Sequence, residues 1–182
     1  EKHIADNGNL QIVYSGNTYD IMAVNEKEIV ENGIDELFSQ DFGLNSVIEI
    51  GFGLGYTAQK FQDKGIDKHI IIEPHPEIYQ DALTWRETQA NKDNIILINE
   101  FAEDWDRLDA SGTIERADLV YYDAADLISE NAIDFIRIVP FILPIYFKWS
   151  KKMVAGYARG NCVITDYLDK IEFTLNETNY IQ

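Results

Sequence analysis

Four short runs of β-branched and aromatic residues alternate with segments of helix length, and this alternation constrains the fold more than any other feature of the sequence. The runs lie at residues 47–50, 69–73, 95–98 and 119–122, and each is typical of a buried strand. The segments between them, at residues 56–64, 78–90 and 103–109, mix polar and apolar residues. Strands that alternate with helices predict parallel pairing with helices on both faces. We therefore predict an α/β fold with a doubly wound, mostly parallel, Rossmann-like sheet.

The flanking segments predict further elements. Residues 131–149 are apolar but contain Pro140 and Pro144, so we expect a broken or kinked helix there. Residues 153–158 predict a fifth strand, and residues 170–180 predict another extended segment. A leading helix is predicted at residues 26–38, interrupted by Gly33, with these apolar residues on one face: Ile29, Ile34, Leu37 and Phe38.

Charge and composition narrow the classes of function. The 182 residues contain 15 Lys and Arg against 32 Asp and Glu, and the net charge of -17 repels nucleic-acid phosphates and anionic lipids. The longest strongly apolar stretch, residues 138–147, has about half the length that a membrane helix needs. The one cysteine, Cys162, cannot form an internal disulfide, which fits a reducing compartment. We expect a cytoplasmic protein that binds neither nucleic acid nor membrane.

The most specific motif is a glycine-rich loop after the first run, Glu49-Ile50-Gly51-Phe52-Gly53-Leu54-Gly55. Glycines let the backbone turn tightly and approach a ligand, and the helix that follows offers unpaired N–H groups. Tyr56 stands where a dinucleotide fingerprint needs a small residue, and Gly-Lys-Ser/Thr is missing, so NAD, FAD and ATP are disfavoured. The acid two residues before the glycines could instead meet the ammonium group of S-adenosylmethionine. A glycine turn selected only for packing is the alternative.

Two further positions indicate a ligand that contains adenosine. Glu73 ends the second run, where an acid can accept hydrogen bonds from both ribose hydroxyls. An exposed carboxylate at a strand end is the alternative for Glu73. Ala102 and Glu103 follow the third run, where an adenine could be sandwiched and its amino group bound by a carboxylate. Capping of a helix by Glu103 explains that position equally well.

These residues resemble those of the class I S-adenosylmethionine-dependent methyltransferases, and especially the guanidinoacetate N-methyltransferases and their arginine-methylating relatives. The likeness runs from about residue 19 to residue 158, and many methyltransferases share its glycine loop. Other segments are more particular to the guanidine-methylating group. They are Ile66-Asp67-Lys68-His69-Ile70-Ile71-Ile72-Glu73, then Glu103-Asp104-Trp105, and Tyr122-Asp123 after the fourth run.

The resemblance implies an activity and a set of site residues. It implies N-methylation of a guanidine or another small cationic amine, with S-adenosylmethionine as cofactor. Asp123 would face the acceptor, and Asp20, after Tyr19, would supply a second carboxylate. The residues that would hold the cofactor are Glu49, Gly51, Phe52, Gly53, Gly55, Glu73, Ala102, Glu103 and Tyr122.

The chemistry that fits these residues is in-line methyl transfer assisted by a carboxylate. A guanidine is protonated in water, and its nitrogen must lose a proton around the time it accepts the methyl group. A carboxylate can bind the planar cation through paired charge-assisted hydrogen bonds and then accept that proton. Asp123 is the first candidate for this base, with Asp20 orienting the acceptor. The histidines His3, His69 and His75 are too scattered for a metal motif, so no metal is predicted.

We expect one domain, made of an N-terminal substrate-side segment and helix (1–45), a cofactor-binding core (46–158) and a short C-terminal extension (159–182). Ser150-Lys151-Lys152 replaces the Pro-Gly-Gly turn that usually precedes the family's fifth strand. We expect the apolar residues 138–147 to be covered, either by the C-terminal residues or by a second chain, which would be another copy or a partner. Two alternatives stay open. One is a scaffold that binds cofactor without turnover, and the other is a methyltransferase of a different small molecule or of a basic protein side chain.

Overall fold

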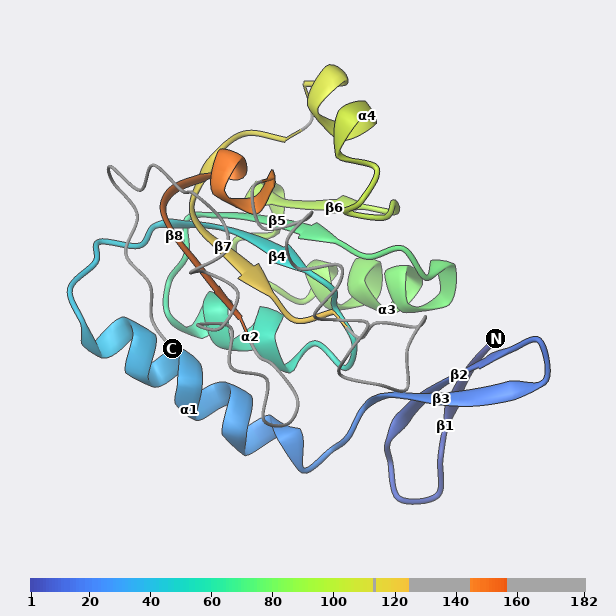
Figure 1. The fold of residues 1–182 in the computed structure, drawn as a ribbon. Coiled ribbons are helices and arrows are strands. Elements are labelled where there is room, and N and C mark those ends of the chain that lie inside the picture. Colours follow the sequence, from blue (N-terminus) through green and yellow to red (C-terminus); the bar gives the residue numbers. More distant parts are fainter. Residues whose placement is uncertain (113, 125–144, 157–182) are drawn as a thin grey trace, which may run out of the picture.

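The centre of the computed structural model, which describes residues 1–112, 114–124 and 145–156, is a five-stranded parallel sheet (Figure 1). Its strands lie in the order β6-β5-β4-β7-β8, and every neighbouring pair is parallel. The chain runs outward from β4 to β6 and then returns to β7 on the other side of β4. The predicted doubly wound sheet is confirmed. The strands are β4 (Ser46–Ile50), β5 (Lys68–Ile72), β6 (Ile95–Ile98), β7 (Ala117–Tyr122) and β8 (Ser150–Gly156).

Helices cover both faces of this sheet (Figure 1). α1 (Glu26–Ser39), α2 (Tyr56–Asp63) and α3 (Pro76–Glu87) pack on one face, and α4 (Trp105–Ala110) packs on the other with the helical residues 145–149. A short 3-10 turn, η1 (Lys92–Asn94), precedes β6. The helices between the strands are those that the sequence predicts, with ends that differ by at most three residues.

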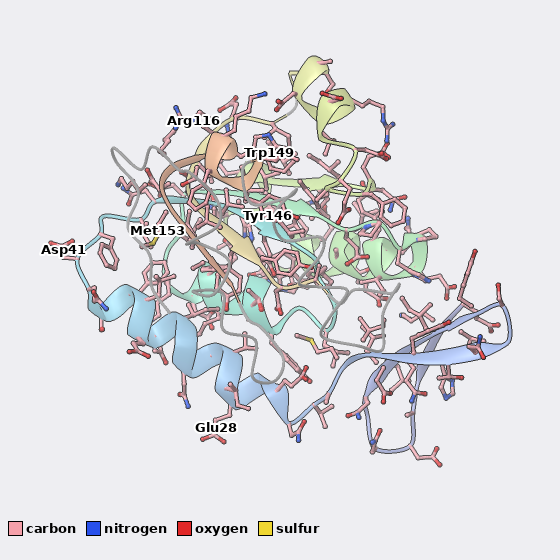
Figure 2. All side chains as sticks on the ribbon, viewed as in Figure 1. Glu28, Asp41, Arg116, Tyr146, Trp149 and Met153 are labelled. Atoms are coloured by element: carbon pink, nitrogen blue, oxygen red, sulfur yellow. The ribbon has the colours of Figure 1, made fainter. Side chains whose placement is uncertain are left out.

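The sheet residues divide between two apolar layers because successive side chains point to opposite faces. On β4, Ile48 and Ile50 pack toward α4 and the helical residues 145–149, whereas Val47 packs toward α1 and α2. Burial on both faces explains why the runs read as continuously apolar. Figure 2 shows Tyr146, Trp149 and Met153 within the body of the molecule, while Glu28 and Asp41 lie at its outer edge.

Helix α1 differs from the prediction in two respects. Gly33 does not interrupt it, and the helix runs unbroken from Glu26 to Ser39. Ile29 is 57% exposed, and Val30 takes the place in the core that was expected for it. The buried stripe is Val30, Ile34 and Leu37, which follows the spacing of three or four residues that a helix face requires.

An antiparallel sheet of three strands, which the sequence patterns did not predict, precedes α1. Its strands are β1 (Lys2–Ile4), β2 (Leu10–Tyr14) and β3 (Asn17–Met22). Ser15 and Gly16 both have positive φ (51° and 79°), as a two-residue hairpin turn between twisted strands requires. Leu10, Ile12 and Met22 belong to the same apolar cluster as Ile78 and Ala82 of α3. This sheet therefore packs against the parallel core.

The fifth strand begins earlier than predicted. Ser150-Lys151-Lys152, expected to replace a turn, instead form the first part of β8. The extended segment at 170–180, most of the broken helix at 131–149 and most of the apolar stretch at 138–147 lie outside the described residues. Among the described residues, no helix is long and apolar enough to cross a membrane.

Candidate functional site

The glycine loop joins β4 to α2 at the carboxyl edge of the sheet, beside the point where the strand order reverses. Ligands of doubly wound folds bind at such a reversal. Gly51 has φ of 93°, and a Cβ atom there would lie 2.6 Å from the backbone oxygen of Asp123. Gly53 also has positive φ (55°), and Gly55 (75°), in the left-handed conformation, directly precedes α2. Both the turn and the close approach to β7 therefore require glycine at position 51.

Glu73 follows β5 directly and ties the loop after β5 to the glycine loop. Its Oε2 accepts a hydrogen bond from the Phe52 N–H at 2.9 Å, and its Oε1 accepts one from the His75 N–H at 2.8 Å. Burial raises the pKa of Glu73, while the backbone N–H groups of Phe52, His75 and Gly53 act in the opposite direction. Each carboxylate oxygen can accept a second hydrogen bond. The arrangement fits the ribose-binding role that the sequence predicts.

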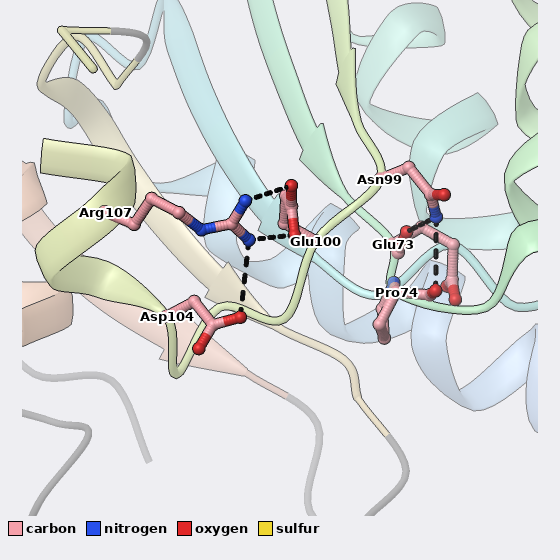
Figure 3. Close-up of polar contacts among 6 residues, drawn as sticks. All are labelled: Glu73, Pro74, Asn99, Glu100, Asp104 and Arg107. Carbon is pink, nitrogen blue, oxygen red and sulfur yellow. Dashed lines mark hydrogen bonds and ion pairs between the residues drawn. The ribbon is translucent and has the colours of Figure 1, made fainter. Parts of the chain in front are cut away.

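The loop after β6 is fixed on both sides (Figure 3). The Asn99 side chain donates to the backbone oxygens of Glu73 and Pro74 at 2.8 and 3.1 Å, which ties the β5 and β6 loops together. Arg107 of α4 forms a two-point ion pair with Glu100. Between these anchors Ala102 is buried, whereas Glu103 is exposed. Asp104, not Glu103, occupies the position that caps α4, and its side chain makes no capping hydrogen bond.

Glu49 is fully buried near the end of β4, on the face that α2 covers. Its Oε2 lies 2.7 Å from Nε2 of His69, while Oε1 has no hydrogen-bond partner among the described residues. Burial raises the pKa of Glu49 well above its usual range, and the nearby carboxylates of Asp123 and Glu73 raise it further. Three carboxyl groups thus gather around the glycine loop.

Asp123 follows β7, and its backbone N–H donates to the Ile50 oxygen at 2.9 Å. Its Oδ2 accepts a hydrogen bond of 2.5 Å from the hydroxyl of Thr57, a buried residue in the first turn of α2. The end of β7 and the first turn of α2 therefore both help to fix the position of Asp123. Tyr122 is half-buried before it, with its ring 5.9 Å from the ring of Tyr146.

Asp20 lies in a different part of the fold from the other predicted residues. It is exposed on β3, and its Oδ1 accepts a hydrogen bond of 2.7 Å from the side chain of Gln11. The same strand ends at Met22, whose sulfur accepts from the Leu54 N–H at 3.3 Å. β3 therefore reaches the glycine loop, and Asp20 stands two residues before that contact. Its role toward an acceptor stays a prediction.

The sequence alone predicts no role for Thr57 or Met22 and no function for His69. A threonine in the first turn of a helix is common enough that only its bond to Asp123 marks it. Met22 belongs to the sheet that was not predicted. His69 was noted only as part of a strand and of a motif. Within the part of the chain that the structure describes, no cluster of His, Cys, Asp or Glu could hold a metal ion.

Comparison with known proteins adds a family match and a fold match. The family model for guanidinoacetate N-methyltransferase matches residues 39–141, more than half of the chain. The matched range contains the glycine loop, Glu73 and Asp123 but not Asp20. No curated protein matches the chain significantly in sequence.

Two solved structures have the same fold. An O-methyltransferase from Bacillus cereus in complex with SAH superposes with a TM-score of 0.54 at 16% identity, covering 74% of this chain and 56% of that one. A protein from Klebsiella pneumoniae, provisionally named an O-methyltransferase, gives a TM-score of 0.52 at 15% identity, covering 85% and 63%. The chain therefore spans less than two thirds of the length of either protein.

Proposed function

Because this chain belongs to the guanidinoacetate N-methyltransferase family, we propose that it binds S-adenosylmethionine and methylates a nitrogen of a guanidine or another cationic amine. The observation that carries the proposal is the gathering of Glu49, Glu73 and Asp123 around the glycine loop at the strand reversal. Glu49 and Glu73 are buried and have no described lysine or arginine bonded to them, so these two carboxyl groups need cationic partners. Both the cofactor and the acceptor are cations.

The residues of the site fit this cofactor. The Oε1 atom of Glu49 is buried without a described partner, as expected of an oxygen that receives an ammonium group. Glu73 holds the ribose, and Ala102 and Glu103 line the site of the adenine. Gly51, Phe52, Gly53 and Gly55 supply the backbone of the methionine side, and Tyr122 closes the site from β7. When bound, S-adenosylmethionine supplies a methyl group that is activated by its sulfonium sulfur.

Asp123 acts as the acceptor-binding carboxylate and as the general base. Thr57 fixes one of its oxygens, so the carboxylate is held in one orientation before the acceptor arrives. The carboxylate binds the acceptor cation and takes the proton that the nitrogen loses as the methyl group arrives. Asp20 orients the acceptor from β3. The molecule's net charge of -17 attracts cationic acceptors.

A methyl-transfer assay tests the proposal. The wild-type protein should transfer radiolabelled methyl from S-adenosylmethionine to at least one compound in a panel of guanidino acids, small amines and basic peptides. Asp123→Asn keeps the size of the side chain but removes its charge. Its turnover should fall about a hundred-fold or more, while affinity for S-adenosylhomocysteine stays within two-fold.

Other outcomes would assign the protein differently. Cofactor binding without methylation of any compound in the panel would favour a scaffold of this fold. Full activity in Asp123→Asn would remove that residue from the mechanism. A folded wild-type protein that binds neither S-adenosylmethionine nor S-adenosylhomocysteine at millimolar concentration would overturn the proposal.

A further inference from the structure

The half-buried side chain of Gln62 on α2 and the buried side chains of His69 and Glu49 beneath it form a hydrogen-bonded chain, of which the proposed function uses only Glu49. Gln62 of α2 lies next to His69 of β5, with its Nε2 3.1 Å from the His69 Nδ1 atom. His69 in turn contacts Glu49, with Nε2 2.7 Å from Oε2. Both His69 and Glu49 are completely shielded from solvent. A polar chain this deep in an apolar layer needs a reason, because each member costs free energy to bury.

The chemistry of the chain fixes which atoms carry protons. An amide nitrogen can only donate, so Nδ1 of His69 accepts from Gln62, and the ring proton sits on Nε2. Burial lowers the pKa of His69 to about 3, which keeps the ring neutral at physiological pH. Nε2–H therefore donates to Oε2 of Glu49. This hydrogen bond fixes one oxygen of the Glu49 carboxyl group. Residues that hydrogen-bond to a metal ligand fix that ligand in the same way.

The other oxygen is directed by the same contact. His69 is in register with Val47, two residues before Glu49, so the bonded Oε2 faces back toward the amino ends of the strands. Oε1 then lies on the side of the carboxyl edge, where Glu73 follows β5 and Asp123 follows β7. These two carboxylates are the charged groups that face Glu49 from its neighbouring strands. An unpartnered buried oxygen beside two carboxylates is suited to a cation.

We propose that His69 and Gln62 are positioning residues, which hold Glu49 so that its free oxygen receives the ammonium group of the cofactor's methionine part. This inference rests on the proposed function, because it assumes that the cofactor binds at the glycine loop. It assigns a role to His69, which lies within the segment shared with guanidine-methylating enzymes but makes no contact with a ligand itself. The ring contacts of His69 with Phe61 and Trp85, at 5.9 and 6.2 Å between centroids, keep its plane fixed.

Binding of two different ligands distinguishes a role of His69 in positioning Glu49 from a purely structural role. S-adenosylhomocysteine carries the ammonium group, whereas 5′-methylthioadenosine lacks the amino-acid part and keeps the adenosine. His69→Phe fills a similar volume but cannot donate to Glu49. It should weaken S-adenosylhomocysteine binding about ten-fold or more in calorimetric titration and change 5′-methylthioadenosine binding less than two-fold. His69→Gln, whose amide can reach the position of Nε2, should recover most of the lost affinity.

Phe61→Leu is the matched control. It removes a ring that packs against His69 but leaves the hydrogen-bonded chain intact, so any loss of affinity should be equal for the two ligands. Equal losses for both ligands in folded His69→Phe, or no loss for either, would overturn the inference. Gln62→Leu gives a second test on a less buried side chain, with a smaller loss expected for S-adenosylhomocysteine alone. A wild-type protein that binds neither ligand would contradict the proposed function instead.

Discussion

At the scale of single residues, the site is characterised by the hydrogen-bond partners of its three carboxyl groups. Glu73 is bound by backbone N–H groups, Asp123 by a hydroxyl, and Glu49 by a neutral histidine. None of these described partners carries a positive charge at neutral pH. Glu49 and Glu73 therefore keep their attraction for an incoming cation, which an internal lysine or arginine would cancel.

Replacement of Thr57 tests the orientation of Asp123. Thr57→Val keeps the shape but removes the hydroxyl that donates to Oδ2. The partly buried acceptor loses its donor, so the free energy of unfolding should fall by about 1–3 kcal/mol. Turnover should fall about ten-fold, because the base is no longer held in place, while cofactor affinity is kept. Urea unfolding and steady-state kinetics measure the two effects.

Thr57→Ser provides the control, because it keeps the hydroxyl and removes only a methyl group. It should retain most of the activity. If Thr57→Val were as active as wild type, Asp123 would not depend on this hydrogen bond.

Glu49 should make stability depend on pH in a defined direction. Its pKa is raised in the folded protein, so the folded state keeps the proton longer than the unfolded state, where the usual value is 4.5. The contribution of Glu49 is fully present below pH 4.5 and is lost as pH rises toward the folded-state pKa. The slope is at most about 1.4 kcal/mol per pH unit. Glu73 acts in the same direction, because its pKa is also raised.

Glu49→Gln should remove the Glu49 part of this slope. In urea unfolding of the cofactor-free protein, the variant should gain stability relative to wild type as pH rises from 5 to 8. The same variant should bind S-adenosylhomocysteine more weakly. His69 acts in the opposite direction, because its pKa is lowered in the folded protein and its contribution to stability is lost as pH falls below about 6.5. Both wild type and variant contain His69, so this effect is common to the two curves. A stability difference that is constant across pH 5 to 8 would show that Glu49 is ionised in both states.

At the scale of elements, the glycine loop is determined by its contact with β7 as much as by its own turn. Position 51 combines positive φ with a near neighbour, because a Cβ atom would lie 2.6 Å from the Asp123 oxygen. Position 65, after α2, has a similar φ of 78° but no atom within 4 Å. The two glycines therefore separate backbone strain from steric contact.

Alanine at these two positions should have unequal effects. Gly65→Ala should cost about 1–2 kcal/mol of unfolding free energy, which is the cost of left-handed backbone for a side chain. Gly51→Ala should cost more than this and should also displace Asp123, so that turnover is lost. Equal costs in thermal unfolding would mean that the loop moves away from β7 without penalty.

At the scale of the whole molecule, the N-terminal sheet is joined to the parallel core through a shared apolar cluster. Leu10 is 1% exposed within that cluster, whereas Tyr14 on the same strand is 70% exposed. Leu10→Ala should cost about 2–5 kcal/mol and Tyr14→Ala less than about 0.5 kcal/mol. Unfolding in one cooperative transition in both variants is expected if the two sheets form one folding unit. Two separate transitions would show that they do not.

The parallel sheet could be predicted from the sequence because its strands are buried on both faces and alternate with helices along the chain. The same reasoning placed Glu49, Glu73 and Asp123 at strand ends, since the carboxyl ends of parallel strands share one edge. The N-terminal sheet was harder to predict from the sequence, because its strands expose one face and mix polar with apolar residues. The turn at Ser15-Gly16 was its clearest signal. Partners such as Thr57 depend on contacts across 66 residues of sequence, which no local pattern contains.

A crystal structure of the protein with S-adenosylhomocysteine and a guanidino acid would show directly whether the carboxyl groups around the glycine loop bind the cofactor and the acceptor. We predict that the ribose lies on Glu73, that the ammonium group lies on Oε1 of Glu49, and that the sulfur faces a guanidine nitrogen that is bound by Asp123. Asp20 should also reach the acceptor from β3. A ligand bound away from the glycine loop, or a sulfur that faces no carboxylate-bound nitrogen, would contradict this prediction.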